Sequence, residues 1–263
     1  MPANFSLADI DFITFDCYGT LIDWETGILN AVRPVLSARG VAGVANDEII
    51  RVYAQLEREI EAAANPTGSD APGLRAGQSD RFMAYRDVLR RVMAGIGDHF
   101  GLALEERELD RLPESMQRWK PFADVPGALA NLARHAGLVI TSNVDDDLFA
   151  FAHEQLTDGS WDFARVVTAQ MCRSYKPYPR HWRVAFTLLD TTPDRVLHVA
   201  ESVYHDVVPA RAMGMRTAWI NRRGERGPGA SGGARASDAA GDAATPDVEC
   251  RTLAELARIL GAS

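Results

Sequence analysis

Short apolar runs alternate with longer amphipathic stretches along most of this 263-residue chain. A run of three to five residues that is rich in apolar, β-branched or aromatic side chains and ends at a polar or turn residue predicts a buried strand. Such runs occur at residues 11–15, 138–141, 164–167, 196–199, 217–220 and 248–250. Helical periodicity follows the second, third and fourth runs, and this alternation predicts a parallel sheet with helices on both faces.

The interval between the first two strands breaks this rhythm. It contains no strand pattern, and helical patterns cover residues 28–39, 47–64, 80–100, 105–119 and 125–134. Helices inserted after the first strand of a doubly wound sheet predict a smaller domain over the carboxyl ends of the strands, where such sheets bind ligands. We therefore expect an α/β protein: a Rossmann-like doubly wound core (1–20 plus 120–263) and an inserted helical cap domain (21–119).

One segment of the core has the composition of a flexible surface loop. Residues 222–247 consist mostly of Gly, Ala, Ser, Arg, Asp and Pro without hydrophobic periodicity. Too little apolar surface is present there to offset the entropy of ordering the chain. A last helical pattern at residues 253–260 follows the sixth strand.

Charge and composition limit the partners of the chain. The formal charge of −8, from 28 basic and 36 acidic residues, gives no basic field for nucleic acid or a membrane surface. A local pocket can still bind a small anionic substrate. Three cysteines make no disulfide framework, and no signal peptide or apolar run of membrane-spanning length (about 20 residues) is present. We expect a cytoplasmic protein, and a homodimer through the amphipathic cap is kept open.

The strongest local signal is an apolar strand that ends in Asp16, with Gly19 and Thr20 directly after it. A carboxylate at the end of a buried strand is held rigidly at the edge of the sheet, as a nucleophile requires. Gly19 allows the tight turn that follows. Taken alone, the motif fits an ordinary strand and Asp turn equally well.

The later strands make the catalytic interpretation more specific. The second strand is followed by Ser142 and Asn143, the third by Lys176, and the fourth by Glu201 and Asp206. The carboxyl ends of parallel strands meet at one edge of a sheet, so these polar groups are expected to lie together.

In these segments the chain resembles the haloacid dehalogenase-like hydrolase superfamily. Its four motifs correspond to Asp16–Thr20, Ser142, Lys176 and the acidic pair Glu201 and Asp206. The segments Asp-Cys-Tyr-Gly-Thr-Leu-Ile-Asp, Thr-Ser-Asn and Tyr-Lys-Pro-Tyr-Pro most resemble the type II 2-haloacid dehalogenases. The resemblance spans essentially the whole chain, including a helical cap between the first two motifs.

The resemblance implies a hydrolase that cleaves a carbon–halogen bond of a small 2-haloalkanoic acid. Asp16 would displace halide and form an aspartyl ester, Lys176 would keep Asp16 ionised, and Asp206 would hold Lys176 and position water. No cofactor is implied. The substrate-binding residues expected from the resemblance are Tyr18, Thr20, Ser142, Asn143, Trp182 and Glu201.

Tyr18 bears on the type of reaction. Phosphatases of the superfamily carry a second aspartate at this position, which protonates an alkoxide leaving group. Halide leaves without a proton, so tyrosine here fits carbon–halogen cleavage. The alternative is that Tyr18 only packs at the interface with the cap.

Several positions depart from the dehalogenase pattern. Glu201 replaces a serine, Val203 replaces a water-positioning asparagine, and Trp182 replaces a pocket tyrosine. The halide-binding arginine of the cap cannot be assigned from sequence; the candidates are Arg51, Arg58, Arg75, Arg81 and Arg86.

Two other functions remain open at this point. Asp16, Glu201 and Asp206 offer oxygen ligands of the kind that Mg²⁺ prefers, so a magnesium-dependent phosphatase is the first alternative. A non-catalytic binder of small anions on the same fold is the second. The favoured hypothesis assigns no metal.

Overall fold

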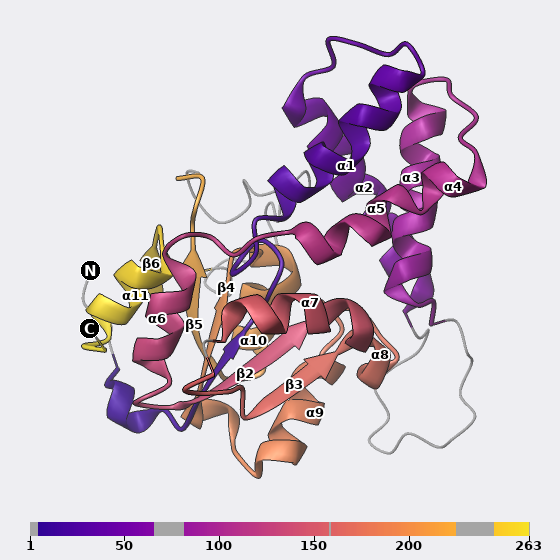
Figure 1. Ribbon diagram of the computed structural model, residues 1–263. Coiled ribbons are helices and arrows are strands. Elements are labelled where there is room, and N and C mark those ends of the chain that lie inside the picture. The colour runs from indigo at the N-terminus through magenta and orange to yellow at the C-terminus, as the bar shows by residue number, and fades with distance from the viewer. Residues whose placement is uncertain (1–4, 66–81, 158, 225–244, 263) are drawn as a thin grey trace.

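The computed structural model describes residues 5–65, 82–157, 159–224 and 245–262. Six parallel strands form one sheet in the order β3-β2-β1-β4-β5-β6 (Figure 1). Their bounds are β1 (Phe12–Phe15), β2 (Gly137–Ser142), β3 (Arg165–Thr168), β4 (Val196–Ala200), β5 (Arg216–Ile220) and β6 (Val248–Cys250). Every bound lies within one residue of its prediction, because short runs of buried β-branched residues are a clear strand signal.

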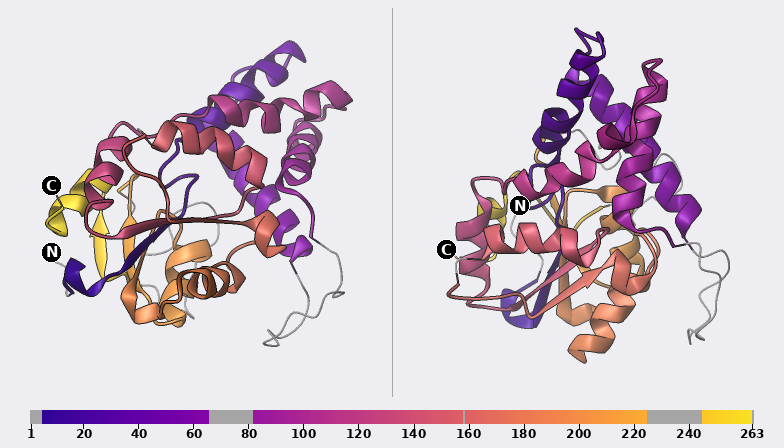
Figure 2. Two further views of the ribbon diagram at one scale, coloured as in Figure 1. Left: turned by 60° about the horizontal axis from the view of Figure 1, so that its bottom comes forward. Right: turned by 45° about the vertical axis from the view of Figure 1, so that its right-hand side comes forward.

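Helices cover both faces of the sheet, as Figure 2 shows. On one face lie α6 (Val125–Leu132), α7 (Asp146–Leu156) and α11 (Leu253–Ile259), and on the other lie α9 (Arg180–Leu189) and α10 (Val208–Ala212). The shorter pieces are η1 (Leu7–Asp9), α8 (Ala169–Cys172), η3 (Pro193–Arg195) and η4 (Val203–Val207). This three-layer arrangement confirms the predicted doubly wound core.

The register of the central strand positions the end of β1. Phe15 is paired with Ile140 of β2 on one side and with Val199 of β4 on the other. Asp16 therefore emerges in the middle of the sheet, between the carboxyl ends of both neighbouring strands. This is the edge at which open α/β sheets bind ligands.

A group of helices between β1 and β2 extends beyond this edge of the sheet (Figure 1). It comprises α1 (Trp24–Ala38), α2 (Asn46–Ala64), α3 (Tyr85–His99), α4 (Glu106–Leu109), α5 (Arg111–Ser115) and η2 (Met116–Arg118). The chain enters and leaves this group side by side, since Ile22 forms an antiparallel bridge with Pro121. This arrangement is consistent with the expected insertion at residues 21–119.

The helical pattern at residues 105–119 corresponds to three short helical pieces, α4, α5 and η2, and not to one continuous helix. Pro113 lacks an N–H and cannot continue the hydrogen-bond ladder from the preceding turn.

The helix expected at residues 80–100, α3, begins later than expected, at Tyr85. There Asp145 of the core accepts hydrogen bonds from the backbone N–H groups of Tyr85 and Arg86, each at 3.0 Å. A carboxylate from a distant segment thus caps the start of α3.

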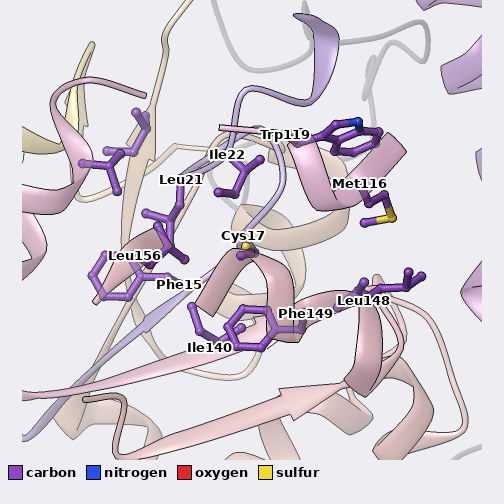
Figure 3. Packing of buried hydrophobic residues seen from close by; sticks show 14 of the residues in the cluster. Phe15, Cys17, Leu21, Ile22, Met116, Trp119, Ile140, Leu148, Phe149 and Leu156 are labelled. Carbon is purple, nitrogen blue, oxygen red and sulfur yellow. The ribbon is translucent and has the colours of Figure 1, made fainter. Parts of the chain in front are cut away.

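The hydrophobic core continues from the sheet to the base of the cap (Figure 3). Phe15 and Ile140 of the sheet pack with Leu148 of α7, and Trp119 belongs to the same buried cluster. Cys17 lies in this cluster and is fully buried, so it packs in the core. The base of the cap is therefore joined to the sheet by continuous apolar packing.

Most of the expected loop 222–247 lies outside the described residues. At its start, the Arg222 guanidinium donates to the carbonyl of Thr20 (2.7 Å) and to Asp124 (3.0 Å). This residue therefore belongs to the packed core. Within the part of the chain that the structure describes, no helix is both long and apolar enough to cross a membrane.

Candidate active site

Asp16 is held at both carboxylate oxygens. Lys176 Nζ donates to Oδ1 (2.9 Å) and Thr20 Oγ1 donates to Oδ2 (2.7 Å). Gly19, in the turn between Asp16 and Thr20, has φ +98°, a conformation that other residues rarely adopt. The turn therefore brings the hydroxyl of Thr20 back to the carboxylate, four residues earlier, and fixes its orientation.

Lys176 uses all three of its ammonium donors on the protein. Nζ donates to Asp16 Oδ1 (2.9 Å), to the carbonyl of Thr141 (2.9 Å) and to Asp206 Oδ1 (2.6 Å). An ammonium group has three donors and no acceptor, so none is left for a ligand. Lys176, only 2% exposed, thus orients and charge-balances the two carboxylates.

Asp206 has a second partner that was not identified from the sequence. His198 Nε2 lies 3.0 Å from Asp206 Oδ1, while Thr14 Oγ1 (2.8 Å) and Trp182 Nε1 (3.4 Å) lie near His198 Nδ1. The indole N–H can only donate, so His198 Nδ1 accepts. Nε2 therefore carries the ring proton and donates a hydrogen bond to Asp206 Oδ1. His198 lies in β4, whose sequence pattern is apolar, so the contact between His198 and Asp206 is visible only in the folded structure.

Burial and charge act in opposite directions on the three central groups. Burial raises the pKa of Asp16, and the charge of Lys176 only partly opposes it. Burial alone would lower the pKa of Lys176, but the charges of Asp16 and Asp206 outweigh it and raise that pKa above its usual range. Burial alone would raise the pKa of Asp206, but Lys176 and His198 hold it well below its usual range. The lysine therefore remains charged between two carboxylates of unequal acidity.

Three further expected residues lie around this centre. Thr20 Oγ1 accepts from the backbone N–H of Glu201 (2.8 Å), and the Glu201 carbonyl accepts from Trp219 Nε1 (2.8 Å). The carboxylate of Glu201 lies beside Gly19. Ser142 Oγ is buried and has no hydrogen-bond partner among the residues that the structure describes. A buried hydroxyl without a partner at the edge of the sheet is a candidate ligand-binding group.

Asn143 was expected to bind the substrate or Asp16, and the structure contradicts this. Its amide donates to Glu61 Oε2 (3.0 Å) and to the carbonyl of Lys176 (3.2 Å), and its Oδ1 accepts from the N–H of Lys176 (2.7 Å). Both N–H donors of the side chain are consumed. Asn143 therefore fixes the backbone that carries Lys176 and joins it to the cap.

Two expected pocket residues are packing residues instead. Tyr18 directs its hydroxyl to the carbonyl of Leu148 (3.3 Å) and its ring edge to Trp119 (centroids 5.7 Å apart). These contacts favour the packing alternative for Tyr18. Trp182 is fully buried on the opposite face of the sheet and packs against His198, Val196 and Met215. Its indole N–H is directed at His198 Nδ1 (3.4 Å), so it supports the histidine that binds Asp206.

The cap contributes residues of both charges. Arg58, Glu61, Lys176 and His205 are among the residues that line a cavity of about 270 Å³ between α2 and the loop after α8. Within the described ranges, Arg58 forms neither an ion pair nor a hydrogen bond. Glu61 and its neighbour Glu57 were not predicted, although acidic residues four apart on one helix face offered a weak signal.

Of the other arginine candidates of the cap, Arg51 and Arg86 do not line this cavity. Arg51 is exposed, and Arg86 forms an ion pair with Asp147 (2.7 Å). Arg75 and Arg81 lie outside the described residues. Among the three candidates that the structure describes, Arg58 is therefore the one that lines the cavity.

The ligand set of the magnesium alternative does not fit the geometry. Asp206 Oδ1 is bound by Lys176 and His198, which compete with any cation for that oxygen. Among the residues described, no three His, Cys, Asp or Glu side chains are grouped closely enough to hold a metal ion. Asp16, Glu201 and Asp206 are thus not assembled as a three-carboxylate site.

The fold and the motifs agree with known proteins. The family model for haloacid dehalogenase-like hydrolases matches residues 10–214, so the chain belongs to this family. It is 27% identical to the (S)-2-haloacid dehalogenase of Pseudomonas sp. (strain YL) over 215 residues, 81% of this chain and 83% of that protein.

Solved structures give the same fold. The L-2-haloacid dehalogenase from Xanthobacter autotrophicus superposes with a TM-score of 0.75, at 22% identity, over 96% of this chain and 98% of that chain. Another structure of that enzyme, with chloropropionic acid covalently bound, has a TM-score of 0.73 at 21% identity, with 96% and 98% covered.

Proposed function

We propose that this protein hydrolyses the carbon–halogen bond of a small (S)-2-haloalkanoic acid. The observation that carries the proposal is the ion pair between Asp16 and Lys176 at 2.9 Å. In addition, Tyr18, at the position of the second aspartate of the phosphatases, packs against the protein. This arrangement supplies a rigid carboxylate nucleophile without a core acid for an alkoxide leaving group. The relatives named above are 2-haloacid dehalogenases, which supports the same substrate class.

The reaction proceeds in two steps. An oxygen of Asp16 attacks C2, the carbon–halogen bond breaks, and its electron pair leaves with the halide. Water then adds to the carbonyl of the aspartyl ester, which releases the 2-hydroxy acid, a proton and free Asp16. Asp206 Oδ2, which has no hydrogen-bond partner in the described part of the chain, is the oxygen that orders this water.

The substrate carboxylate needs a cation and a hydrogen-bond donor. Arg58 supplies the charge from the cap and Ser142 Oγ supplies a donor from the core. Arg58 has no ion pair or hydrogen bond, and Ser142 Oγ has no hydrogen bond, in the described residues, unlike Lys176, whose donors are all used. Glu201 occupies the position next to Thr20 and helps to close this end of the site.

The deciding experiment measures halide release from each enantiomer of 2-chloropropionate by the purified protein in excess chelator. Chloride release from the (S) enantiomer alone is the expected result, with Asp16→Asn as the inactive control. If halide is not released, while phosphate esters are hydrolysed only after Mg²⁺ is added, the phosphatase alternative replaces the proposal. If ligands bind but neither reaction occurs, the protein is a binder of small anions.

A further inference from the structure

The cap brings two acidic side chains close to the nucleophile. Glu57 and Glu61 are four residues apart on α2 and therefore share one face of the helix. Glu61 is 4% exposed, and the charges of Asp16 and Lys176 both act on its pKa. The chemistry described so far uses neither carboxyl group.

The surroundings decide which of the two acids keeps a proton. Burial raises the pKa of Glu57, but its Oε1 accepts from the hydroxyls of Tyr53 (2.8 Å) and Tyr85, which oppose this by stabilising its charged form. Burial and the nearby charge of Glu57 raise the pKa of Glu61 well above its usual range. Glu57 is half-buried and Glu61 is buried, and carboxylates one helix turn apart repel each other, so Glu61 retains its proton when Glu57 is ionised.

The hydrogen bonds of Glu61 leave room for a proton on one carboxyl oxygen. Its Oε2 accepts from Asn143 Nδ2 at 3.0 Å, and its Oε1 has no partner within the described ranges. A protonated carboxyl group has one oxygen that accepts and one hydroxyl that donates. The Glu61 hydroxyl is therefore available to the cavity that this side chain lines together with Arg58 and Lys176.

The direction of the displacement reaction places the leaving group near the cap. A nucleophile attacks carbon from the side opposite to the departing group, and Asp16 attacks from the core. We propose that Glu61, as a neutral acid, donates a hydrogen bond to the departing halide and thereby favours fluoride and chloride as leaving groups. These halides accept hydrogen bonds more strongly than bromide does. The proton remains on Glu61, and the electron pair of the broken bond stays on the halide.

This role rests on the proposed dehalogenation, and leaving-group dependence tests it separately. The substrates are 2-fluoro-, 2-chloro- and 2-bromopropionate, and the variants are Glu61→Leu and Glu61→Gln. Glu59→Gln, on the exposed side of α2, is the matched control. Loss of a donor to a developing anion lowers kcat by about 100-fold or more. We expect that loss for the fluoro acid in Glu61→Leu and a much smaller loss for the bromo acid. Glu61→Gln keeps an N–H donor and most of the activity.

The pH profile gives a second readout. The charged and titratable groups that face Glu61 are Glu57, Arg58, Asp16, Lys176 and His205, together with the hydroxyls of Tyr53, Tyr85 and Tyr175. Burial raises the pKa of all three tyrosines, so none of them titrates near neutral pH. Burial lowers the pKa of His205 to about 4 and the carboxylates raise that of Lys176, so neither titrates near neutral pH. With the fluoro acid, kcat falls as the pH rises through the raised pKa of Glu61. Glu61→Gln lacks this decline, and Glu57→Gln moves it to lower pH because a repelling charge is gone.

The possible results separate the two hypotheses. An equal loss for all three halides in Glu61→Leu overturns the role of Glu61 and leaves the proposed dehalogenation intact. No halide release by the unmodified protein from any of the three acids overturns both. If thermal melting shows that Glu61→Leu is unfolded, the Gln variant decides, and an unchanged alkaline decline in Glu61→Gln overturns the role.

Discussion

His198 Nε2 lies 3.0 Å from Asp206 Oδ1, so a histidine in the middle of β4 holds the carboxylate that orients Lys176. Since Nδ1 accepts from Thr14 and Trp182 on the other side of the ring, the imidazole is fixed in one tautomer. A row of buried hydrogen bonds thus connects the packed face of the sheet with the nucleophile.

His198 is expected to act as a positioning residue. A hydrogen bond to a charged group contributes about 1.5–3 kcal/mol, so its loss in His198→Leu lowers kcat about tenfold or more. KM for the haloacid stays nearly constant, because His198 does not touch the substrate. Steady-state kinetics of His198→Leu and His198→Gln check this, and the Gln variant should recover part of kcat. A change confined to KM would contradict this role.

Asp16→Asn is expected to abolish halide release without lowering the melting temperature. Burial raises the pKa of Asp16, so the folded state binds this proton more tightly than the unfolded state does. The ionised group therefore disfavours folding as the pH rises through that pKa, and a neutral amide removes the effect. Thermal unfolding of both proteins at neutral pH is the measurement. A variant that melts well below the unmodified protein contradicts the expectation.

The value of kcat/KM should fall at acid pH, and the apparent pKa of this decline should lie above the ordinary aspartate pKa of about 3.9. The nucleophile must be ionised, and activity is lost as the pH falls through the raised pKa of Asp16. Asp206 cannot cause this decline, because its pKa is held below the usual range. The measurement is kcat/KM for 2-bromopropionate between about pH 3 and pH 7, a range that spans the ordinary pKa of aspartate. A decline with an apparent pKa below the ordinary value contradicts this prediction.

Trp182→Phe is expected to change stability and not substrate affinity. The indole is fully buried below the sheet, so the smaller ring leaves a gap and removes the N–H that faces His198. The free energy of unfolding should fall by about 1–3 kcal/mol. Denaturant unfolding and KM for the haloacid are the two measurements. A large rise in KM with unchanged stability would restore Trp182 to the substrate pocket.

The sequence by itself determined the sheet, the order of its strands along the chain and the chemistry at their ends. Buried strands have a short apolar pattern, and the ends of parallel strands meet at one edge, so Asp16, Lys176 and Asp206 could be grouped before any contact was known. The helical insertion was visible for the same reason, because its periodicity differs from that of a strand.

Only the tertiary structure decided which side chains use their polar atoms on the protein and which face a ligand. Asn143 and Tyr18 were expected at the substrate, but each hydrogen-bonds to a segment that is distant in the sequence. Arg58 could not be selected among the cap arginines, and the buried acid Glu61 was not noticed. Burial and hydrogen-bond partners depend on how distant elements pack, and periodicity along the chain contains no information about them.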